Sequence, residues 1–337
     1  MTPLIRTGAA ALVSLALSGA ARAGESVTFL IDWLPAGDKA AVYLGVEKGL
    51  FAAEGLDVTV QSGRGSSDVV TKLGTGAADM GTGGLSALLQ AKAQGDVPVT
   101  AVMAVYTRQP DAIFTTVEAS VSSLKDLVGK TIATATFSSS NVAWPLVLKA
   151  NGVAPDAITV LKVDPGALAP MLATGRVAAT INWLTVAPAF AGPLAETGKR
   201  FKALPWSEFG YEGYGLSVFA SDRMLAKRPE TVRKFLAAYA RATQAAIDDP
   251  AEAARALKAR VPEVETERAA QEWTASIPLM VNDLSRKDGM GVFEPGLLKT
   301  TWTWVAQAQG IAEGSFDPAK AVTNGYLPSV PGKKAER

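Results

Sequence analysis

The chain has 337 residues with 33 basic and 32 acidic side chains, so its charge is nearly balanced. A near-neutral chain has no general attraction for nucleic acid or for an anionic membrane. It contains neither cysteine nor histidine, which excludes disulfides, His–Cys zinc sites, Ser–His–Asp triads and Cys–His dyads. Only carboxylate, lysine, serine or tyrosine chemistry remains, and we expect no metal site, no cofactor and no nucleic-acid partner.

The first 23 residues have the pattern of a secretory signal peptide. Arg6 supplies the positive charge, residues 8–17 form an apolar run, and Ala21-Arg22-Ala23 is a small-x-small cleavage site. The apolar run is too short to span a bilayer, although a permanent N-terminal anchor is the alternative. Without a cysteine there is no lipoprotein anchor, so we expect cleavage after Ala23 and a free periplasmic protein of a Gram-negative bacterium.

The segment after the leader alternates short apolar strands with helices, as in an α/β lobe. Strands are predicted over residues 27–31, 57–61, 78–81 and 99–106. Helices are predicted over residues 39–48, 66–74 and 84–94. The last of these strands is an almost continuous apolar run, which is typical of a parallel sheet covered on both faces.

The same alternation starts again near Ser120, which predicts a second parallel-sheet lobe. Ser123 and Asp126 are placed to cap a short helix. Strands are predicted over residues 130–135, 158–163 and 177–182. Helices are predicted over residues 138–150, 166–174 and 186–197.

A strand over residues 215–221 is predicted to return to the first lobe, and only helices follow it. These helices are predicted over residues 229–248, 252–260, 265–280 and 295–309. Two chain crossings, near 113–118 and 211–216, would form a hinge. The predicted organisation is a signal peptide (1–23), a first lobe (24–115 and 214–325), a second lobe (116–213) and a tail (326–337).

Three polar turns are candidate ligand contacts, because ligands of such sheets bind beyond the carboxyl ends of the strands, where helix N-termini point inward. Each turn has an ordinary alternative explanation: a serine helix cap or the geometry of a tight glycine turn. The candidates in these turns are Arg64, Ser66, Ser67, Thr82, Gly83, Ser138, Ser139 and Asn141.

Aromatic side chains near strand ends could stack on a planar ligand. Trp33 and Trp183 follow predicted strands, Tyr106 ends one, and Tyr211 lies at the return crossing. The alternative for each is packing in the core. Asp32 could accept a hydrogen bond from an amino group of the ligand, or could only brace the turn before Pro35.

Six segments in order resemble the extracytoplasmic solute-binding proteins of ABC importers. Asp32-Trp33-Leu34-Pro35 is the first. The others are VEKGLFAAEGLDV, GAADMGTGGLSALL, SLKDLVGKTIAT, VDPGALAPMLATGRVAATINW and GLSVFASDRMLAKRPETVRKFLAAYARA. The branch that they resemble most contains thiamine-pyrimidine-precursor binding proteins and related pyrimidine synthases, and sulfonate and nitrate binders are similar to it.

The resemblance implies an α/β fold of the type II periplasmic binding protein class, with each lobe a sheet flanked by helices and a ligand cleft between the lobes. It implies a non-enzymatic monomer that captures a small planar heteroaromatic compound by hinge closure and delivers it to ABC permease subunits. Similar pyrimidine binders use an acidic residue against an exocyclic amine, which makes Glu208 a candidate. In this chain Ala36-Gly37-Asp38-Lys39 stands where those binders have an asparagine and then a histidine.

Two other functions remain open at this point. A binder of an alkanesulfonate, taurine or nitrate-like anion would use Arg64, Arg108 and the helix N-termini. An enzyme of the same fold is the other class, but the similar pyrimidine synthases are built around a histidine and a cysteine-rich motif. This chain has neither residue type.

Overall fold

A computed structural model describes residues 24–95 and 97–328. The predicted signal peptide and most of the predicted tail therefore lie outside the described residues. Within those two ranges, no helix combines the length and the hydropathy that crossing a membrane requires.

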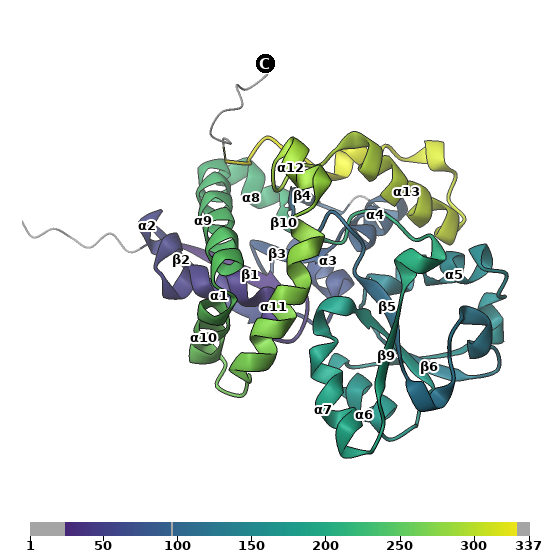
Figure 1. The fold of residues 1–337 in the computed structure, drawn as a ribbon. Helices are drawn as coiled ribbons and strands as arrows, with labels where there is room; N and C mark the ends of the chain where they lie inside the picture. The colour runs from purple at the N-terminus through teal and green to yellow at the C-terminus, as the bar shows by residue number, and fades with distance from the viewer. Residues whose placement is uncertain (1–23, 96, 329–337) are drawn as a thin grey trace, which may run out of the picture.

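Two five-stranded sheets form the centres of two lobes (Figure 1). The first sheet has the order β2-β1-β3-β10-β4. Its strands are β2 (Leu56–Ser62), β1 (Glu25–Ile31), β3 (Met80–Gly84), β10 (Leu216–Ser221) and β4 (Val99–Ala104). β1 pairs in parallel with β2 and β3, whereas β10 runs antiparallel to β3 and β4. The returning strand was therefore predicted correctly.

The second sheet has the order β7-β6-β8-β5-β9. Its strands are β7 (Thr159–Val163), β6 (Thr131–Ala135), β8 (Ala179–Trp183), β5 (Asp111–Thr116) and β9 (Phe201–Pro205). The three strands predicted for this lobe are parallel, since β6 pairs in parallel with β7 and β8. The sheet as a whole is mixed, because β5, which was not predicted, is antiparallel to both β8 and β9. The predicted crossing at 113–118 overlaps β5, so the chain enters the second sheet earlier, at Asp111. The two-lobed α/β class itself is confirmed.

Thirteen α-helices cover the sheets in the described part of the chain. In the first half they are α1 (Ala40–Glu47), α2 (Leu50–Ala53), α3 (Ser66–Gly74), α4 (Leu85–Gln94), α5 (Ser140–Ala150), α6 (Leu168–Ala173) and α7 (Pro188–Glu196). After β9 they are α8 (Asp222–Lys227), α9 (Pro229–Asp248), α10 (Pro250–Arg260), α11 (Thr266–Met280), α12 (Asp283–Asp288) and α13 (Pro295–Gln309). Two 3₁₀ turns, η1 (Gly37–Lys39) and η6 (Leu184–Val186), matter for the site.

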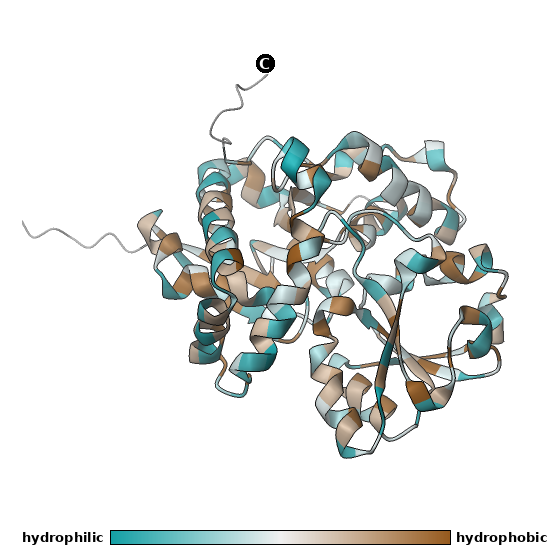
Figure 2. Ribbon diagram, in the orientation of Figure 1, coloured by the Kyte–Doolittle hydropathy of each residue, from teal (hydrophilic) through white to brown (hydrophobic). Residues whose placement is uncertain are grey.

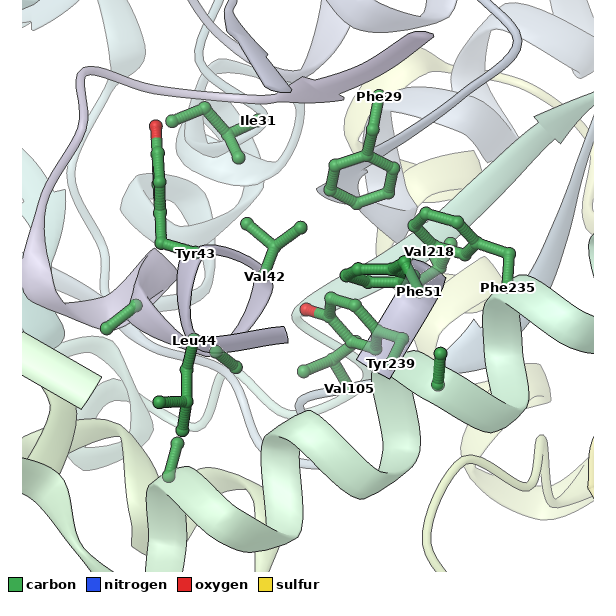
Figure 3. Packing of buried hydrophobic residues seen from close by; sticks show 14 of the residues in the cluster. Phe29, Ile31, Val42, Tyr43, Leu44, Phe51, Val105, Val218, Phe235 and Tyr239 are labelled. Atoms are coloured by element: carbon green, nitrogen blue, oxygen red, sulfur yellow. The ribbon is translucent and has the colours of Figure 1, made fainter. Parts of the chain in front are cut away.

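The side chains of β1 alternate between the two faces of the first sheet, as the pleat of a strand requires. Phe29 and Ile31 face a cluster that includes α1, α2 and α9, whereas Leu30 faces the cluster of α3, α4 and α13. Figure 3 shows Phe29 beside Phe51 and Phe235, and the ring centroids of Phe29 and Phe235 are 4.9 Å apart. Hydrophobic and hydrophilic residues alternate along α9 and α11 (Figure 2), as on helices with one buried face.

Helix α11 belongs to the first lobe by sequence but lies against both lobes. It packs on η1 of the first lobe and on η6 and α7 of the second, and it runs along the boundary between the lobes in Figure 1. The site described below is held between η1 and η6.

Candidate functional site

A buried cavity lies between the lobes, beyond the carboxyl ends of β1, β6 and β8. It contains about 360 Å³ of empty space, part of it open to solvent. Its lining residues are Asp32, Trp33, Asp38, Lys39, Gly65, Ser66, Ser138, Ser139, Asn182, Trp183 and Val186. We call this space the inner cavity. Its position at the carboxyl ends of the strands is where α/β sheets generally bind ligands.

Three charged side chains of the first lobe form a compact cluster in the inner cavity. Lys39 Nζ lies 3.2 Å from Asp32 Oδ1 and 3.0 Å from Asp38 Oδ2, and all three side chains are at most 4% exposed. Burial alone would lower the pKa of Lys39, but the Asp32 and Asp38 carboxylates outweigh it and raise that pKa well above its usual range. One ammonium between two carboxylates leaves the cluster acceptor-rich.

Asp32 is fixed by its own lobe. Its Oδ2 accepts a hydrogen bond from Ser66 Oγ at 3.1 Å, and its Oδ1 accepts one from Thr82 Oγ1 at 3.4 Å. Ser66 Oγ in turn accepts from the backbone N–H of Gly84 at 2.9 Å. The serine at the start of α3 therefore positions Asp32 as well as lining the cavity.

Two acceptor atoms on the cavity wall have no hydrogen-bond partner among the described residues: Asp38 Oδ1 and Asn182 Oδ1. Both residues are buried, at 3% and 4% exposure. Asn182 Nδ2 donates to Thr180 Oγ1 at 2.8 Å, which directs the amide oxygen away from that contact. Because buried polar atoms are nearly always paired in native proteins, these two acceptors indicate a ligand or water that donates hydrogen bonds to them.

Two tryptophans contribute to the cavity wall. The ring centroid of Trp183 lies 5.0 Å from Lys39 Nζ and 6.0 Å from that of Tyr106. Burial raises the pKa of Asp111 to about 7, against hydrogen bonds from Ser140 and Trp183 that lower it.

A second space lies next to the inner cavity, and we call it the outer chamber. It holds about 690 Å³ of empty space, again partly open to solvent, and shares Trp33, Asn182 and Val186 with the inner cavity. Its remaining lining residues are Leu34, Pro35, Ala36, Pro165, Gly166, Ala169, Ala189, Phe190, Val264, Arg268 and Glu272.

Glu272 connects α11 to the charged turn of the inner cavity. Its Oε2 accepts a hydrogen bond from the backbone N–H of Gly37 at 2.6 Å, and its Oε1 lies 3.8 Å from Arg268 Nε. Burial raises the pKa of Glu272 to about 7, and the Gly37 hydrogen bond opposes this effect. Glu272 therefore holds the η1 turn that carries Asp38 and Lys39.

The lobes touch each other around the inner cavity. Thr185 Oγ1 of η6 donates to Asp38 Oδ2 at 2.9 Å across the cleft. Ser67 N–H donates to the carbonyl of Phe137 at 3.1 Å. Gly65 has φ 145°, and a Cβ there would collide with the Phe137 carbonyl. The glycine of this turn therefore permits close approach of the lobes.

Part of the residue set predicted from the sequence meets in the inner cavity. These residues are Asp32, Trp33, Ser66, Ser138, Ser139 and Trp183. Three more predicted residues do not line the cavity but contact residues around it. The Thr82 hydroxyl donates to Asp32, and the Tyr106 hydroxyl donates to the Asp38 carbonyl at 3.5 Å. The Ser67 N–H makes the contact between the lobes described above.

The other predicted residues lie off the cavity wall. Asn141 donates to the carbonyl of Ala135 at the start of α5, and the guanidinium of Arg64 stacks over the Phe137 ring at 4.8 Å. A side chain at Gly83 would strike the Phe219 ring, so this glycine serves packing inside the first lobe.

The two candidates at the return crossing also lie off the cavity. Glu208 is exposed on a 3₁₀ turn after β9. Tyr211 is buried against Trp206 and Trp304 and accepts a hydrogen bond from Gln109 Nε2 at 3.2 Å.

Sequence reasoning missed the residues that give the cavity its polarity. Asp38 and Lys39 were noted only as a departure from the family pattern, and Asn182 only as the end of a strand. The sequence signal was weak, because Asp and Lys side chains are usually exposed, and only the apolar helix α1 that follows them indicates burial.

Comparisons with known proteins show which sequences and folds this chain is similar to. A family model described as NMT1/THI5 like matches residues 37–253. The riboflavin-binding protein RibY of Chloroflexus aurantiacus is 29% identical over 335 residues, covering 97% of this chain and 93% of RibY. A 4-amino-5-hydroxymethyl-2-methylpyrimidine phosphate synthase of Saccharomyces cerevisiae is 27% identical over 239 residues, covering 68% of this chain and 69% of the synthase.

Among solved structures, the alkanesulfonate-binding protein SsuA of Xanthomonas axonopodis pv. citri, bound to MOPS, is similar with a TM-score of 0.68. The sequences are 17% identical, and the alignment covers 89% of this chain and 98% of that one. At this identity the likeness establishes the fold, which is that of the periplasmic binding proteins.

Proposed function

Because the chain belongs to the NMT1/THI5-like family, we propose that it is the extracytoplasmic solute-binding component of an ABC importer. Its ligand is a small planar heteroaromatic compound with N–H donors, of the pyrimidine or thiamine-precursor kind. It works in the periplasm as a monomer, released from a cleaved signal peptide, and passes its ligand to membrane permease subunits. The relatives support this ligand class, because one is named for riboflavin and others for an aminopyrimidine.

The observation that carries the ligand class is the pair of unpartnered buried acceptors, Asp38 Oδ1 and Asn182 Oδ1. They lie on opposite lobes, so one ligand that donates to both would bridge the cleft. An exocyclic amine or a ring N–H supplies such donors at the edge of a flat molecule. Trp33 and Trp183 on the same wall offer aromatic surface to its ring.

Closure follows from the same contacts. A ligand that bonds to both lobes has more contacts in the closed form than in the open form. It therefore shifts the protein toward closure by that difference in affinity. The Thr185–Asp38 hydrogen bond is made only when the lobes meet, and it adds to the stability of the closed form although Thr185 itself does not line the cavity.

An anionic ligand is disfavoured by the charges of the cavity. The ammonium of Lys39 is already engaged by two carboxylates. Arg64 lies over Phe137, and Arg108 is exposed. A sulfonate or nitrate in the inner cavity would face an acceptor-rich wall without an uncommitted cation among the described lining residues.

An enzyme is the second class to be weighed, because some relatives are named as synthases. The chain contains no histidine and no cysteine, which removes the commonest bases and nucleophiles. We propose binding without turnover.

The test is a thermal-shift and calorimetry screen on refolded protein, so that carried-over ligand is removed. Probes are aminopyrimidines, flavins, alkanesulfonates, taurine and nitrate. A ligand at a hundred times its Kd should stabilise the fold by about 2.7 kcal/mol. We expect binding of heterocycles with N–H donors, weakened about fivefold by Trp33→Ala, since aromatic stacking contributes on the order of 1 kcal/mol.

Binding of sulfonates or nitrate alone would replace the proposed ligand class with the anionic one. Conversion of a bound heterocycle, followed by mass spectrometry, would show that the protein is an enzyme.

A further inference from the structure

The outer chamber differs from the inner cavity in chemistry. Leu34, Pro35, Ala189 and Phe190 line it with apolar surface, and the 3.8 Å Arg268–Glu272 pair is its charged feature. Leu34 is 44% exposed although it is a large apolar residue. Clefts that bind small molecules are generally lined mostly by apolar side chains with a few polar groups.

The two spaces are adjacent. Trp33, Asn182 and Val186 line both, so a ligand held at Asn182 in the inner cavity lies next to the outer chamber. The inner cavity is the smaller of the two spaces, with about 360 Å³ of empty space, part of it open to solvent. The outer chamber adds about 690 Å³.

We propose that the ligand has two parts: a planar head with N–H donors in the inner cavity and an apolar, ring-sized second group in the outer chamber. This inference rests on the proposed function, because it takes the same cleft as the binding site. The head donates to Asp38 Oδ1 and Asn182 Oδ1. The second group covers Leu34 and Phe190 and passes beside Trp33, whose indole is the wall common to both parts.

The apolar character of the chamber decides what the second group is. A charged phosphate or sulfonate there would meet apolar walls and Glu272 as well as Arg268, which is already paired with that carboxylate. An aromatic or aliphatic group instead gains free energy from leaving water in proportion to its buried area. A single small ring that fills only the inner cavity would leave this apolar wall wet.

A matched ligand pair tests the proposal. The head alone is 2,4-diaminopyrimidine, and the extended probes carry a benzyl group at C5 or at C6 of the same ring. Burying a phenyl-sized group should make the better extended probe about 10- to 100-fold tighter than the head alone, as measured by calorimetry on the refolded full chain.

A matched pair of variants tests whether the higher affinity of the extended probe comes from the outer chamber. Ala189→Trp fills the outer chamber from α7, whereas Ala195→Trp adds the same side chain at an exposed position of the same helix. We expect Ala189→Trp to reduce the advantage of the extended probe to less than about threefold and to leave the Kd of the head unchanged. Ala195→Trp should change neither value.

The outcomes separate the two hypotheses. If the head binds but neither benzyl group improves its affinity, or if Ala189→Trp weakens both probes equally, the two-part ligand is wrong and the proposed function stands. If neither the head nor the extended probes bind, the proposed ligand class fails and the two-part ligand fails with it.

Discussion

The two lobes contribute to the inner cavity in different ways. The first lobe supplies Asp32, Asp38 and Lys39, which are already bonded to one another. Ser66 and Glu272 hold this group from within the same lobe. The first-lobe half of the site is therefore assembled before the second lobe arrives.

The second-lobe half is less constrained. The amide oxygen of Asn182 has no hydrogen-bond partner among the described residues, and the hydroxyl of Thr185 donates a hydrogen bond to Asp38 of the other lobe. The difference suggests a division of roles: the first lobe presents a fixed arrangement of charges, and the second lobe completes the site on closing. Preorganisation of one half limits the entropy that ligand binding must overcome. The predictions below test this division.

The largest effect is expected for Lys39→Met. The substitution keeps a long side chain but leaves two buried carboxylates without their cation, and breaking a buried ion pair typically costs 3–5 kcal/mol. We expect a loss of about 3–5 kcal/mol in the free energy of unfolding, measured by urea denaturation. Lys48→Met is the control, because the Lys48–Glu252 pair is exposed and should contribute less than about 1 kcal/mol. Equal losses in the two variants would show that the cluster does not hold the first-lobe half together.

The next effect concerns Glu272 and pH. Its pKa is about 7 in the folded chain against an ordinary value of 4.5. Between these pH values the folded state binds more protons than the unfolded state, so stability falls as the pH rises through this window. The shift corresponds to roughly 3 kcal/mol. Asp111, whose pKa is also raised to about 7, adds a similar fall.

We therefore expect the unfolding free energy of Glu272→Gln to decrease less between pH 5 and 7.5 than that of the unmodified chain. The decrease that is left in this variant should come from Asp111. Glu267→Gln changes an exposed carboxylate of the same helix and should leave the slope as in the unmodified chain. An unchanged slope in Glu272→Gln would mean that this carboxyl does not titrate in the folded state near pH 7.

Local patterns in the sequence were sufficient for much of the fold. Helix α9 was predicted with its observed bounds, because Pro229 marks its start and its apolar residues recur with helical spacing. The Ser66 turn and the two tryptophans at strand ends were also identified, since each lies next to a strand whose pattern is clear. These features depend on residues close together in the chain.

The features that were missed depend on contacts between distant residues. β9, with the sequence Phe-Lys-Ala-Leu-Pro, is short and contains a lysine and a proline, so it has no alternating pattern of its own. Without β9 the segment just before β10 had no strand beside it to fix its position, and Glu208 and Tyr211 were assigned to the cleft. The role of Asp38 and Lys39 could not be recognised from the sequence, because it depends on Asp32, Glu272 and Thr185, which surround them only in the folded chain.

A smaller effect is expected for Asn182→Ala, which removes the free acceptor of the second lobe. One hydrogen bond to a neutral group contributes about 1 kcal/mol, so the Kd of an aminopyrimidine should rise about fivefold. Asn151→Ala provides the comparison, because Asn151 bonds only to backbone carbonyls of the second lobe, at Val147 and Phe209. It should lower stability without changing the Kd. A Kd that is unaffected by Asn182→Ala would remove the second lobe from ligand recognition.

The smallest effect is expected for Thr185→Val, and it separates closure from recognition. Thr185 is fully buried and lines neither the inner cavity nor the outer chamber. Its hydroxyl nevertheless bonds to Asp38 across the cleft. Replacing it by an isosteric methyl should weaken the closed form by about 1 kcal/mol. The open population then increases, so the Kd rises by up to about fivefold.

Small-angle scattering of the ligand-free protein should show a larger radius of gyration for Thr185→Val if the unmodified chain is mostly closed. Thr115→Val removes a comparable buried bond, from Thr115 to the Ala178 carbonyl, inside the second lobe. It should lower stability but leave both the radius and the Kd unchanged. If the two variants behave alike, Thr185 only stabilises the fold, and the contact between the lobes at Asp38 does not control closure.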